Sequence, residues 1–248
     1  MRDQVDILGV KVNKVNMGQA KDRVVEFIEG GRQGRMIVTP NSEMIVMARE
    51  DPELRAILNQ ADLSVPDGAG VVLASRIFKD PVPERVAGFD LMKELFSLAV
   101  INNYSIYLLG GKPGIVETAG QKIREEFPTL NLCGSHHGYL DKRLLEEVIN
   151  EINGLEPDLL FIGMGVPLQE KFLAQNLHRL KVRVAMTVGG AFDVLAGRVN
   201  RAPLWMQRMH LEWLFRLLQE PSRLGRMLAL PRFVILVFWE LIRKRFGG

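Results

Sequence analysis

The sequence predicts an α/β fold: a parallel sheet with helices on both faces, followed by a C-terminal helical appendage. Two observations carry this prediction. Between residues 1 and 200, short apolar runs alternate about six times with amphipathic stretches, which is the pattern of parallel βαβ units. After Asn200 the alternation stops, and the remaining chain is rich in Leu, Trp and Met. We therefore predict a Rossmann-like catalytic domain over residues 1–200 and a helical appendage over residues 201–248.

Local signals support the individual elements of the domain. Gly9 lies at the turn of an expected hairpin over residues 7–12, and Asn16 with Gln19 forms a capping box that begins a helix. Pro52 suits the first position of a further helix. The remaining expected strands cover residues 36–39, 63–65, 105–109, 130–134, 158–163 and 182–188, with helical stretches between and after them.

Composition excludes several classes of protein. The 248 residues are 47% hydrophobic and 25% charged, which excludes a disordered, collagen-like or disulfide-stapled chain. The single cysteine, Cys133, excludes an intramolecular disulfide and a multi-Cys metal site. Because no further His or Cys lies at ligand spacing from the adjacent His136 and His137, we expect no metal site. The first residues lack the apolar stretch of a signal peptide, which predicts a cytoplasmic protein.

The appendage is basic, whereas the rest of the chain is mildly acidic. Residues 201–248 carry a net charge of +6 and residues 1–200 a net charge of −3, and all three tryptophans lie in the appendage. Such a segment is expected to seek nucleic acid, an anionic membrane surface or a phosphorylated ligand. We expect its helices over residues 202–219, 222–230 and 232–246, with breaks at Pro221 and Pro231.

The end of the appendage favours a membrane surface over nucleic acid. The run Phe233–Trp239 is too apolar for a nucleic-acid groove and too short to span a bilayer, which needs about 20 residues. Arg232 and the cluster Arg243–Arg245 bracket this run, as expected for a helix lying in the membrane interface. The alternative is a helix docked on the body of the protein or on another subunit.

Polar or glycine-rich loops follow the expected strands, at the edge where doubly wound sheets bind ligands. Glycine at such a turn lets the backbone approach a phosphate, and a helix N-terminus attracts negative charge. The alternative for each glycine is a tight strand-to-helix turn. Taken together, the loops favour a nucleotide-type ligand. Their residues of interest are Thr39, Asn41, Asp67, Gly110, Gly111, Gly163, Gly165, Gln169, Lys171, Gly189, Gly190 and Asp193.

Asp67 is the carboxylate that best fits a general base. It follows a strand and Pro66 and precedes Gly68, so we expect it to lie on a rigid turn in the crevice. The alternative is an Asp that hydrogen-bonds its own turn. Thr39 and Asn41 occupy equivalent places and are expected to hydrogen-bond a sugar, or else to end a strand and cap a helix.

Arginines carry most of the charge of the appendage. Arg216, Arg223 and Arg226 are spaced by seven and three residues, which would put them on similar faces of a helical path. Guanidinium groups can neutralise a diphosphate without a metal ion. The alternative is a basic face exposed to solvent.

The motifs as a set strongly resemble one family, the bacterial surface-polymer glycosyltransferases of the WecG/TagA/CpsF type. The most specific blocks are Gly163-x-Gly-x-Pro-x-Gln-Glu-Lys171 and Gly189-Gly-Ala-Phe-Asp193. The set also includes Thr39-Pro-Asn41, Pro66-Asp67-Gly68, Arg201-Ala-Pro and Glu212-Trp213, and the resemblance runs in order along nearly the whole chain.

The resemblance implies an inverting, metal-independent transferase without a cofactor. The implied donor is UDP-N-acetylmannosamine or its uronic acid, and the implied acceptor is a polyprenyl-diphosphate-linked N-acetylglucosamine at the inner face of the membrane. The product starts wall teichoic acid or a related polymer.

The resemblance also assigns roles to residues. Asp67 would be the general base, with Thr39 and Asn41 on the sugar and Gln169 nearby. The glycine loops and Asp193 would hold UDP, while Arg216, Arg223 and Arg226 would close over the diphosphate. Arg85 and Lys171 are the further residues expected to bind substrate.

Two other functions remain open at this point. A Rossmann-type oxidoreductase would need a complete dinucleotide fingerprint, which we cannot place in this sequence. A non-enzymatic membrane-docking module would need only the appendage. We expect no nucleic-acid partner, and the exposed appendage leaves self-association into a homo-oligomer open.

Overall fold

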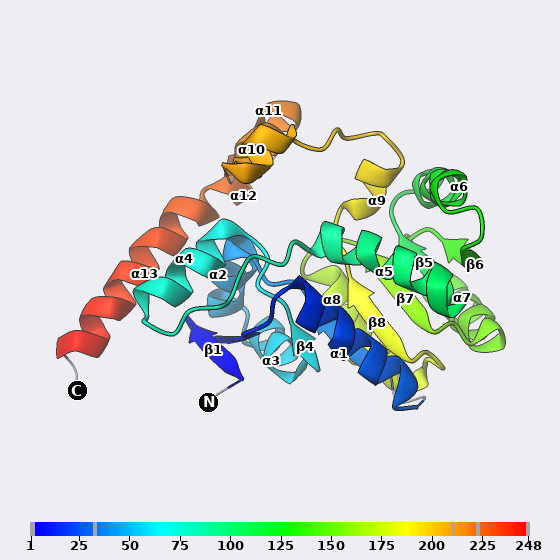
Figure 1. Cartoon of the computed structure of the whole chain (residues 1–248), viewed down its shortest axis with the longest axis horizontal. Helices are drawn as coiled ribbons and strands as arrows, with labels where there is room; N and C mark the ends of the chain where they lie inside the picture. The colour runs from blue at the N-terminus through cyan, green and yellow to red at the C-terminus, as the bar shows by residue number, and fades with distance from the viewer. Residues whose placement is uncertain (1–2, 32–33, 210, 222–223, 247–248) are drawn as a thin grey trace.

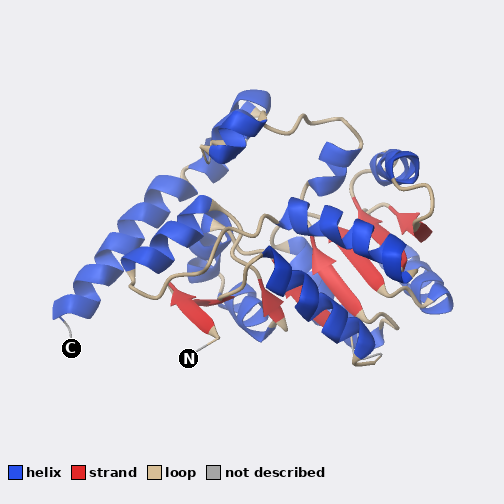
Figure 2. Ribbon diagram, in the orientation of Figure 1, coloured by secondary structure: helices blue, strands red, loops and turns tan. Residues whose placement is uncertain are grey.

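The computed structural model describes residues 3–31, 34–209, 211–221 and 224–246. Its centre is a six-stranded parallel sheet in the order β4-β3-β8-β7-β5-β6 (Figure 2). The strands are β3 (Arg35–Val38), β4 (Leu63–Ser64), β5 (Ser105–Gly110), β6 (Asn131–His136), β7 (Leu159–Gly163) and β8 (Val184–Thr187). The expected N-terminal hairpin is present as β1 (Gln4–Ile7) and β2 (Val10–Asn13).

Helices cover both faces of the sheet, which confirms the predicted α/β architecture. One apolar cluster joins the sheet to α1 (Met17–Glu29), α5 (Gly88–Asn102), α6 (Ile115–Glu126) and α9 (Ala191–Leu195). The other joins it to α2 (Ser42–Glu50), α3 (Pro52–Gln60), α4 (Ala69–Ile77), α7 (Lys142–Leu155) and α8 (Leu168–Asn176), the last followed by the 3-10 turn η1 (Leu177–Arg179). Because side chains alternate along a strand, Leu108 and Leu109 of β5 enter opposite clusters. Figure 1 shows α1 and α5 crossing the near face.

Helix starts follow the local signals in the sequence. The carboxamide of Asn16 accepts a hydrogen bond from the Gln19 backbone N–H at 2.8 Å, and the Gln19 side chain accepts one from the Asn16 N–H at 3.0 Å. The expected capping box of α1 is therefore confirmed. At α3 the cap is one-sided: Asp51 Oδ1 accepts a hydrogen bond from the Leu54 backbone N–H at 2.9 Å, and Pro52 occupies the first helical position.

Over its described residues the appendage forms four helices, and two boundaries differ from expectation. The single helix expected over residues 202–219 is divided into α10 (Leu204–Arg208) and α11 (Glu212–Gln219). After α12 (Leu224–Met227), α13 (Ala229–Phe246) includes Pro231, so the break expected at Pro231 was wrong. Pro231 lies in the first turn of α13, where a helix needs no backbone N–H and proline is tolerated.

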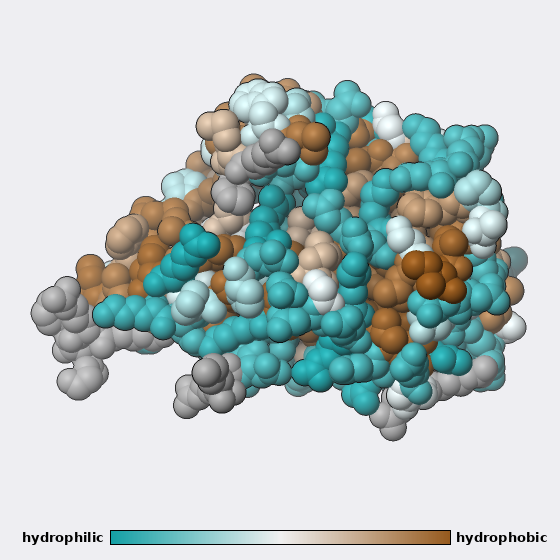
Figure 3. Space-filling view, in the orientation of Figure 1, coloured by the Kyte–Doolittle hydropathy of each residue, from teal (hydrophilic) through white to brown (hydrophobic). Residues whose placement is uncertain are grey.

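α13 lies against the α/β body and leaves a second apolar face exposed. Phe233 and Val237 are buried in the cluster that also contains residues of α2 and α4. The opposite face of α13 exposes five large apolar side chains, Val234, Ile235, Phe238, Trp239 and Ile242. Figures 1 and 3 show this helix extending along one side of the molecule with brown, hydrophobic surface. Within the described ranges, no helix is long and apolar enough to cross a membrane.

Candidate active site

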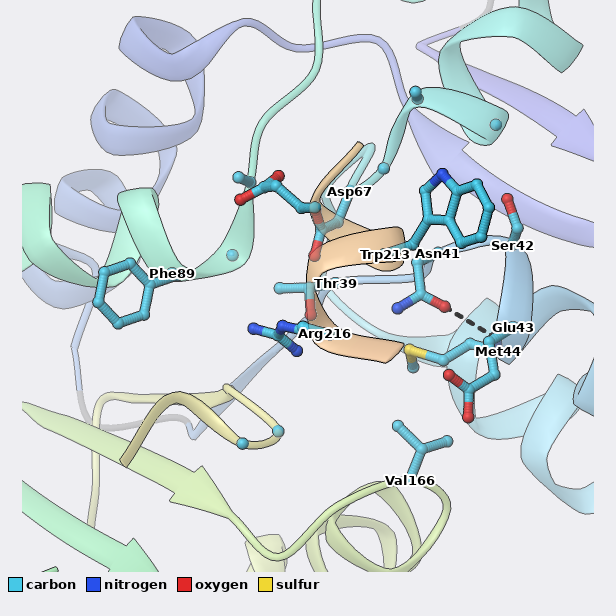
Figure 4. Close-up of a pocket in the computed structure, with 18 of the residues that line it drawn as sticks. Thr39, Asn41, Ser42, Glu43, Met44, Asp67, Phe89, Val166, Trp213 and Arg216 are labelled. Atoms are coloured by element: carbon cyan, nitrogen blue, oxygen red, sulfur yellow. Dashed lines mark hydrogen bonds between the residues drawn. The ribbon is translucent and has the colours of Figure 1, made fainter. Parts of the chain in front are cut away.

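A cavity of about 560 Å³ lies where the β3, β4 and β8 ends meet the appendage (Figure 4). The α/β body contributes the loop after β3, the turn after β4, the segment before α5 and the turn after β8. The appendage contributes side chains from α11, α12 and α13. A cavity at the carboxyl ends of parallel strands is the expected ligand position in this kind of sheet. Here it is closed on one side by helices that lie more than 100 residues after Asp67 in the sequence.

Asp67 lies in this cavity on the turn that follows β4. The turn is fixed because the backbone carbonyl of Pro66 accepts a hydrogen bond from the Val86 N–H at 2.9 Å, and because Gly68 adopts a positive φ of 91°. Burial raises the pKa of the Asp67 carboxyl, while the positive charges of Arg85 and Arg216 lower it in part. The Asp67 side chain is still 23% exposed, so a ligand in the cavity can reach it. A carboxylate with these properties can accept a proton from a substrate hydroxyl.

Arg85 lies between the carboxylate of Asp67 and that of Glu212 on α11. Its Nε is 3.8 Å from Asp67 Oδ1, and its guanidinium forms an ion pair with Glu212. Arg201 joins the same cluster: it pairs with Asp90 at 2.6 Å, and its Nε is 3.8 Å from Glu212 Oε1. Glu212 therefore connects two arginines next to the general base candidate. Glu212 and Arg201 belong to motifs of the family, but the sequence alone indicates no role for them, although Glu212 stands out as one of three acidic residues in a strongly basic segment.

Thr39 and Asn41 both line the cavity, as the sequence predicted for neighbours of Asp67. Thr39 packs so closely on Gly88 that a Cβ at position 88 would lie 2.9 Å from Thr39 Cγ2, which accounts for glycine there. Asn41 caps α2, with its Oδ1 accepting from the Met44 N–H at 3.0 Å. The cap orients the Asn41 amide nitrogen into the cavity (Figure 4). Capping and ligand contact are therefore compatible roles for Asn41.

The appendage brings arginines to the cavity. Arg216 of α11 points its guanidinium into the cavity near Thr39 (Figure 4). Arg226 of α12 also lines the cavity, with its Nε 3.9 Å from Glu43 Oε1. Arg223 lies outside the described residues. Two of the three expected arginines thus face the same space as Asp67, which is suitable for a diphosphate.

Gln169, Gly189 and Gly190 line the cavity from the side of β7 and β8. Next to Gln169, Glu170 is buried completely, at 0% exposure, in the first turn of α8. Burial raises the pKa of the Glu170 carboxyl from 4.5 to about 7, although a hydrogen bond from Gln169 opposes the shift. The sequence motif included Glu170, but the sequence alone did not indicate that its carboxylate would be buried.

The structure, over the residues it describes, does not place the other six expected substrate-binding residues in the lining of this cavity. Lys171 pairs with Asp51 at 2.8 Å and Glu53 at 2.7 Å. A Cβ on Gly110 would lie 2.4 Å from the Gly163 carbonyl oxygen, so close strand packing alone accounts for glycine at position 110. Roles in UDP binding stay predictions for Gly110, Gly111, Gly163, Gly165, Lys171 and Asp193.

The fold and cavity define a class: an α/β enzyme whose candidate base faces arginines at the carboxyl edge of a parallel sheet. The chain belongs to the glycosyl transferase WecG/TagA/CpsF family, whose sequence model matches residues 5–247. This confirms the resemblance seen in the motifs and makes the protein a glycosyltransferase. Glycosyl transfer is therefore favoured over the oxidoreductase and the non-enzymatic module.

Named relatives cover most of the chain. An N-acetylglucosaminyldiphosphoundecaprenol N-acetyl-beta-D-mannosaminyltransferase of Bacillus subtilis (strain 168) is 36% identical over 212 residues, which are 86% of this chain and 82% of the relative. The protein of the same name from Staphylococcus aureus (strain MW2) is 34% identical over 232 residues, which are 93% of this chain and 91% of the relative.

Burial of Glu170 predicts a specific pH dependence of stability. The pKa of this carboxyl is raised in the folded state, so its contribution to stability is fully present below pH 4.5 and is lost as the pH rises through about 7. Glu170→Gln has no such titration. Urea unfolding measures the free energy of unfolding of both proteins. Between pH 4.5 and pH 8 this free energy should rise by about 3 kcal/mol in the variant relative to the wild type. Equal pH dependence in the two proteins would contradict the buried, titrating carboxyl.

Proposed function

We propose that this glycosyltransferase moves N-acetylmannosamine from UDP-N-acetylmannosamine to an N-acetylglucosamine carried on undecaprenyl diphosphate. The names of the relatives support this acceptor and this sugar, at 34–36% identity over most of the chain. The observation that carries the proposal is the position of Asp67, on a fixed turn in a cavity that also contains Arg85 and Arg216. The reaction would be an early step in the synthesis of wall teichoic acid or a related surface polymer.

The proposed chemistry is a single displacement. Asp67 accepts the proton of the acceptor hydroxyl, and the hydroxyl oxygen forms a bond to the anomeric carbon of the donor sugar. The bond between that carbon and the diphosphate breaks at the same time, so UDP leaves and the configuration inverts. Thr39 and Asn41 contact sugar hydroxyls, and Gln169 with the Gly189-Gly190 turn lies on the donor side.

Arginines are proposed to take the role that a metal ion has in many sugar-nucleotide enzymes. Negative charge develops on the leaving diphosphate, and cations that are already in place stabilise it. Arg216 and Arg226 line the cavity and are available for this role. Arg223 is included in the proposal on the strength of the family resemblance. We therefore propose that transfer proceeds in the presence of EDTA.

The general base is tested by Asp67→Asn, which keeps the size of the side chain but cannot accept the proton. Because a positioned base contributes 10²–10⁴-fold, kcat should fall by roughly this factor while the affinity for UDP stays within about threefold. The measurement is UDP release from UDP-N-acetylmannosamine, with and without lipid-linked N-acetylglucosamine, in EDTA. Asp22→Asn, on the exposed side of α1, is the matched control. Wild-type turnover by Asp67→Asn would eliminate Asp67 as the base.

A peripheral position on the inner face of the cell membrane is part of the proposal, because a polyprenyl acceptor stays in the bilayer. The exposed face of α13 supports it: residues 234, 235, 238, 239 and 242 recur at helical spacing and are 46–67% exposed. Arg232 and Arg243 flank this face, although each also pairs with a carboxylate, Glu50 and Glu240 respectively. Interfacial helices combine apolar and basic residues in this way.

Membrane association is tested by Trp239→Ser. Removing the largest exposed apolar side chain of α13 should weaken binding to phosphatidylglycerol vesicles about tenfold in a flotation assay, because less apolar surface enters the bilayer. Ile101→Ser, at a position of α5 that is 80% exposed, is the control and should bind as the wild type does. Equal vesicle binding by Trp239→Ser and wild type would remove α13 from the proposed membrane surface.

A further inference from the structure

Glu170 is a buried acid that the proposed chemistry does not use. It does not belong to the lining of the cavity, and it is 0% exposed. Burying a carboxyl group costs free energy unless hydrogen bonds compensate for the lost water. Its position in the first turn of α8 offers partial compensation, because a helix N-terminus favours negative charge. The side chain beside it, Gln169, adds a hydrogen bond to one of its two oxygens.

Gln169 connects Glu170 to the cavity. The Gln169 Nε2 donates to Glu170 Oε1 at 2.7 Å, and the Gln169 Oε1 accepts from the Gly189 backbone N–H at 3.0 Å. Gln169 is 1% exposed, yet it lines the cavity together with Gly189. A chain of hydrogen bonds therefore runs from the buried carboxyl through one carboxamide to the turn after β8.

Glu170 and the Gly189 N–H together determine which way the Gln169 carboxamide faces. The oxygen and nitrogen of a carboxamide are similar in size, so only its partners distinguish the two orientations. With Glu170 as acceptor on one side, the NH₂ group must face it and the oxygen must face the Gly189 N–H. The opposite orientation would place two donors against each other at Gly189 and leave both of them unsatisfied, which is costly in a buried place.

Thr187 gives the carboxyl a second link to the same turn. It is the last residue of β8, is fully buried, and its hydroxyl favours the charged form of Glu170. The oxygens Glu170 Oε2 and Thr187 Oγ1 are both buried and have no hydrogen-bond partner in the described part of the chain. Hydrogen bonds therefore connect Glu170 to the Gly189 backbone through Gln169, and the Thr187 hydroxyl lowers the Glu170 pKa from the end of β8. Both Gly189 and Thr187 belong to the segment that enters the cavity.

We propose that Glu170 is a positioning residue for the donor side of the site. It fixes the orientation of the Gln169 carboxamide and, through it, the Gly189-Gly190 turn. The second N–H of Gln169 is then directed to a ligand in the cavity, the nucleoside diphosphate sugar. This proposal rests on the proposed function for the identity of the donor.

Two substitutions at position 170 separate positioning from packing. Glu170→Gln keeps a carbonyl acceptor for Gln169 and offers an NH₂ group toward Thr187, so it reproduces the protonated carboxyl. Its KM for UDP-N-acetylmannosamine should stay within about twofold of the wild type. Glu170→Leu has a similar size but no acceptor. Its KM should rise about tenfold and its affinity for UDP should fall equally, with kcat changed less than threefold, as expected for the loss of about one hydrogen bond in binding.

A double-mutant cycle measures whether Glu170 acts on UDP affinity through Gln169. A merely structural role of Glu170 would not produce this coupling. In the Gln169→Ala background the carboxamide is absent, so adding Glu170→Leu should cause no further loss of UDP affinity. Additive losses, or a Glu170→Leu variant with the KM and UDP affinity of the wild type, would overturn the proposal. Circular dichroism and Tm check that each variant is folded. If Glu170→Leu does not fold, Glu170→Met is used in its place.

Failure of this inference is distinguishable from failure of the proposed function. UDP affinity is measured by calorimetry without an acceptor, so it tests Glu170 even if the wild type does not transfer N-acetylmannosamine. If the wild type does transfer the sugar and Glu170→Leu binds UDP and donor normally, only the positioning role is wrong.

Discussion

The arrangement of the site depends on one carboxylate, Glu212, which fixes α11 of the appendage to the α/β body, whereas α13 is held there by the buried side chains of Phe233 and Val237. No residue of α11 is fully buried, so apolar burial alone does not hold this helix over the cavity. Glu212 pairs with Arg85, which faces Asp67, and lies near Arg201, which is paired with Asp90. Attachment of α11 and the electrostatics of Asp67 are thus set by the same ion pairs. When α11 is in place, Arg216 is also brought to the cavity.

The parallel sheet supplies the other half of the site. β3 and β4 are neighbours and end at the same edge, so the segments that follow them, with Thr39 and Asp67, enter one cavity. The turn that carries Asp67 is held by a backbone hydrogen bond, and Gly88 allows Thr39 to pack closely beside it. The body therefore provides the candidate base on a fixed turn, and the appendage provides the positive charge that the proposed leaving group requires.

Local signals explain why much of the fold is predictable from the sequence. The capping box at Asn16 and Gln19 and the apolar strands act over a few residues, so they identify elements correctly. Asp67, Thr39 and Asn41 meet as expected because parallel topology places strand ends together. By contrast, Pro231 was expected to break the chain before a helix but lies within the first turn of that helix, and proline is compatible with both positions.

Long-range pairing explains what the sequence did not reveal. Arg85 and Glu212 are 127 positions apart, and no local pattern indicates that they meet. Lys171 lies in a motif of the family, yet its ammonium pairs with Asp51 and Glu53. Because these carboxylates lie far from Lys171 in the sequence, no local pattern predicts the contact. Glu170 resembles any exposed glutamate near a helix start until the fold buries it beside Gln169.

Asp67 is proposed as the base; burial raises its pKa, and the charges around it, including Glu212 from the appendage, adjust that pKa further. The most direct measurement is the pH profile of kcat/KM for the wild type, Glu212→Gln and Arg85→Met. Glu212 raises the pKa of Asp67 and Arg85 lowers it, so the rise in rate should move to lower pH in Glu212→Gln and to higher pH in Arg85→Met. If kcat/KM rises at the same pH in all three proteins, the account is contradicted.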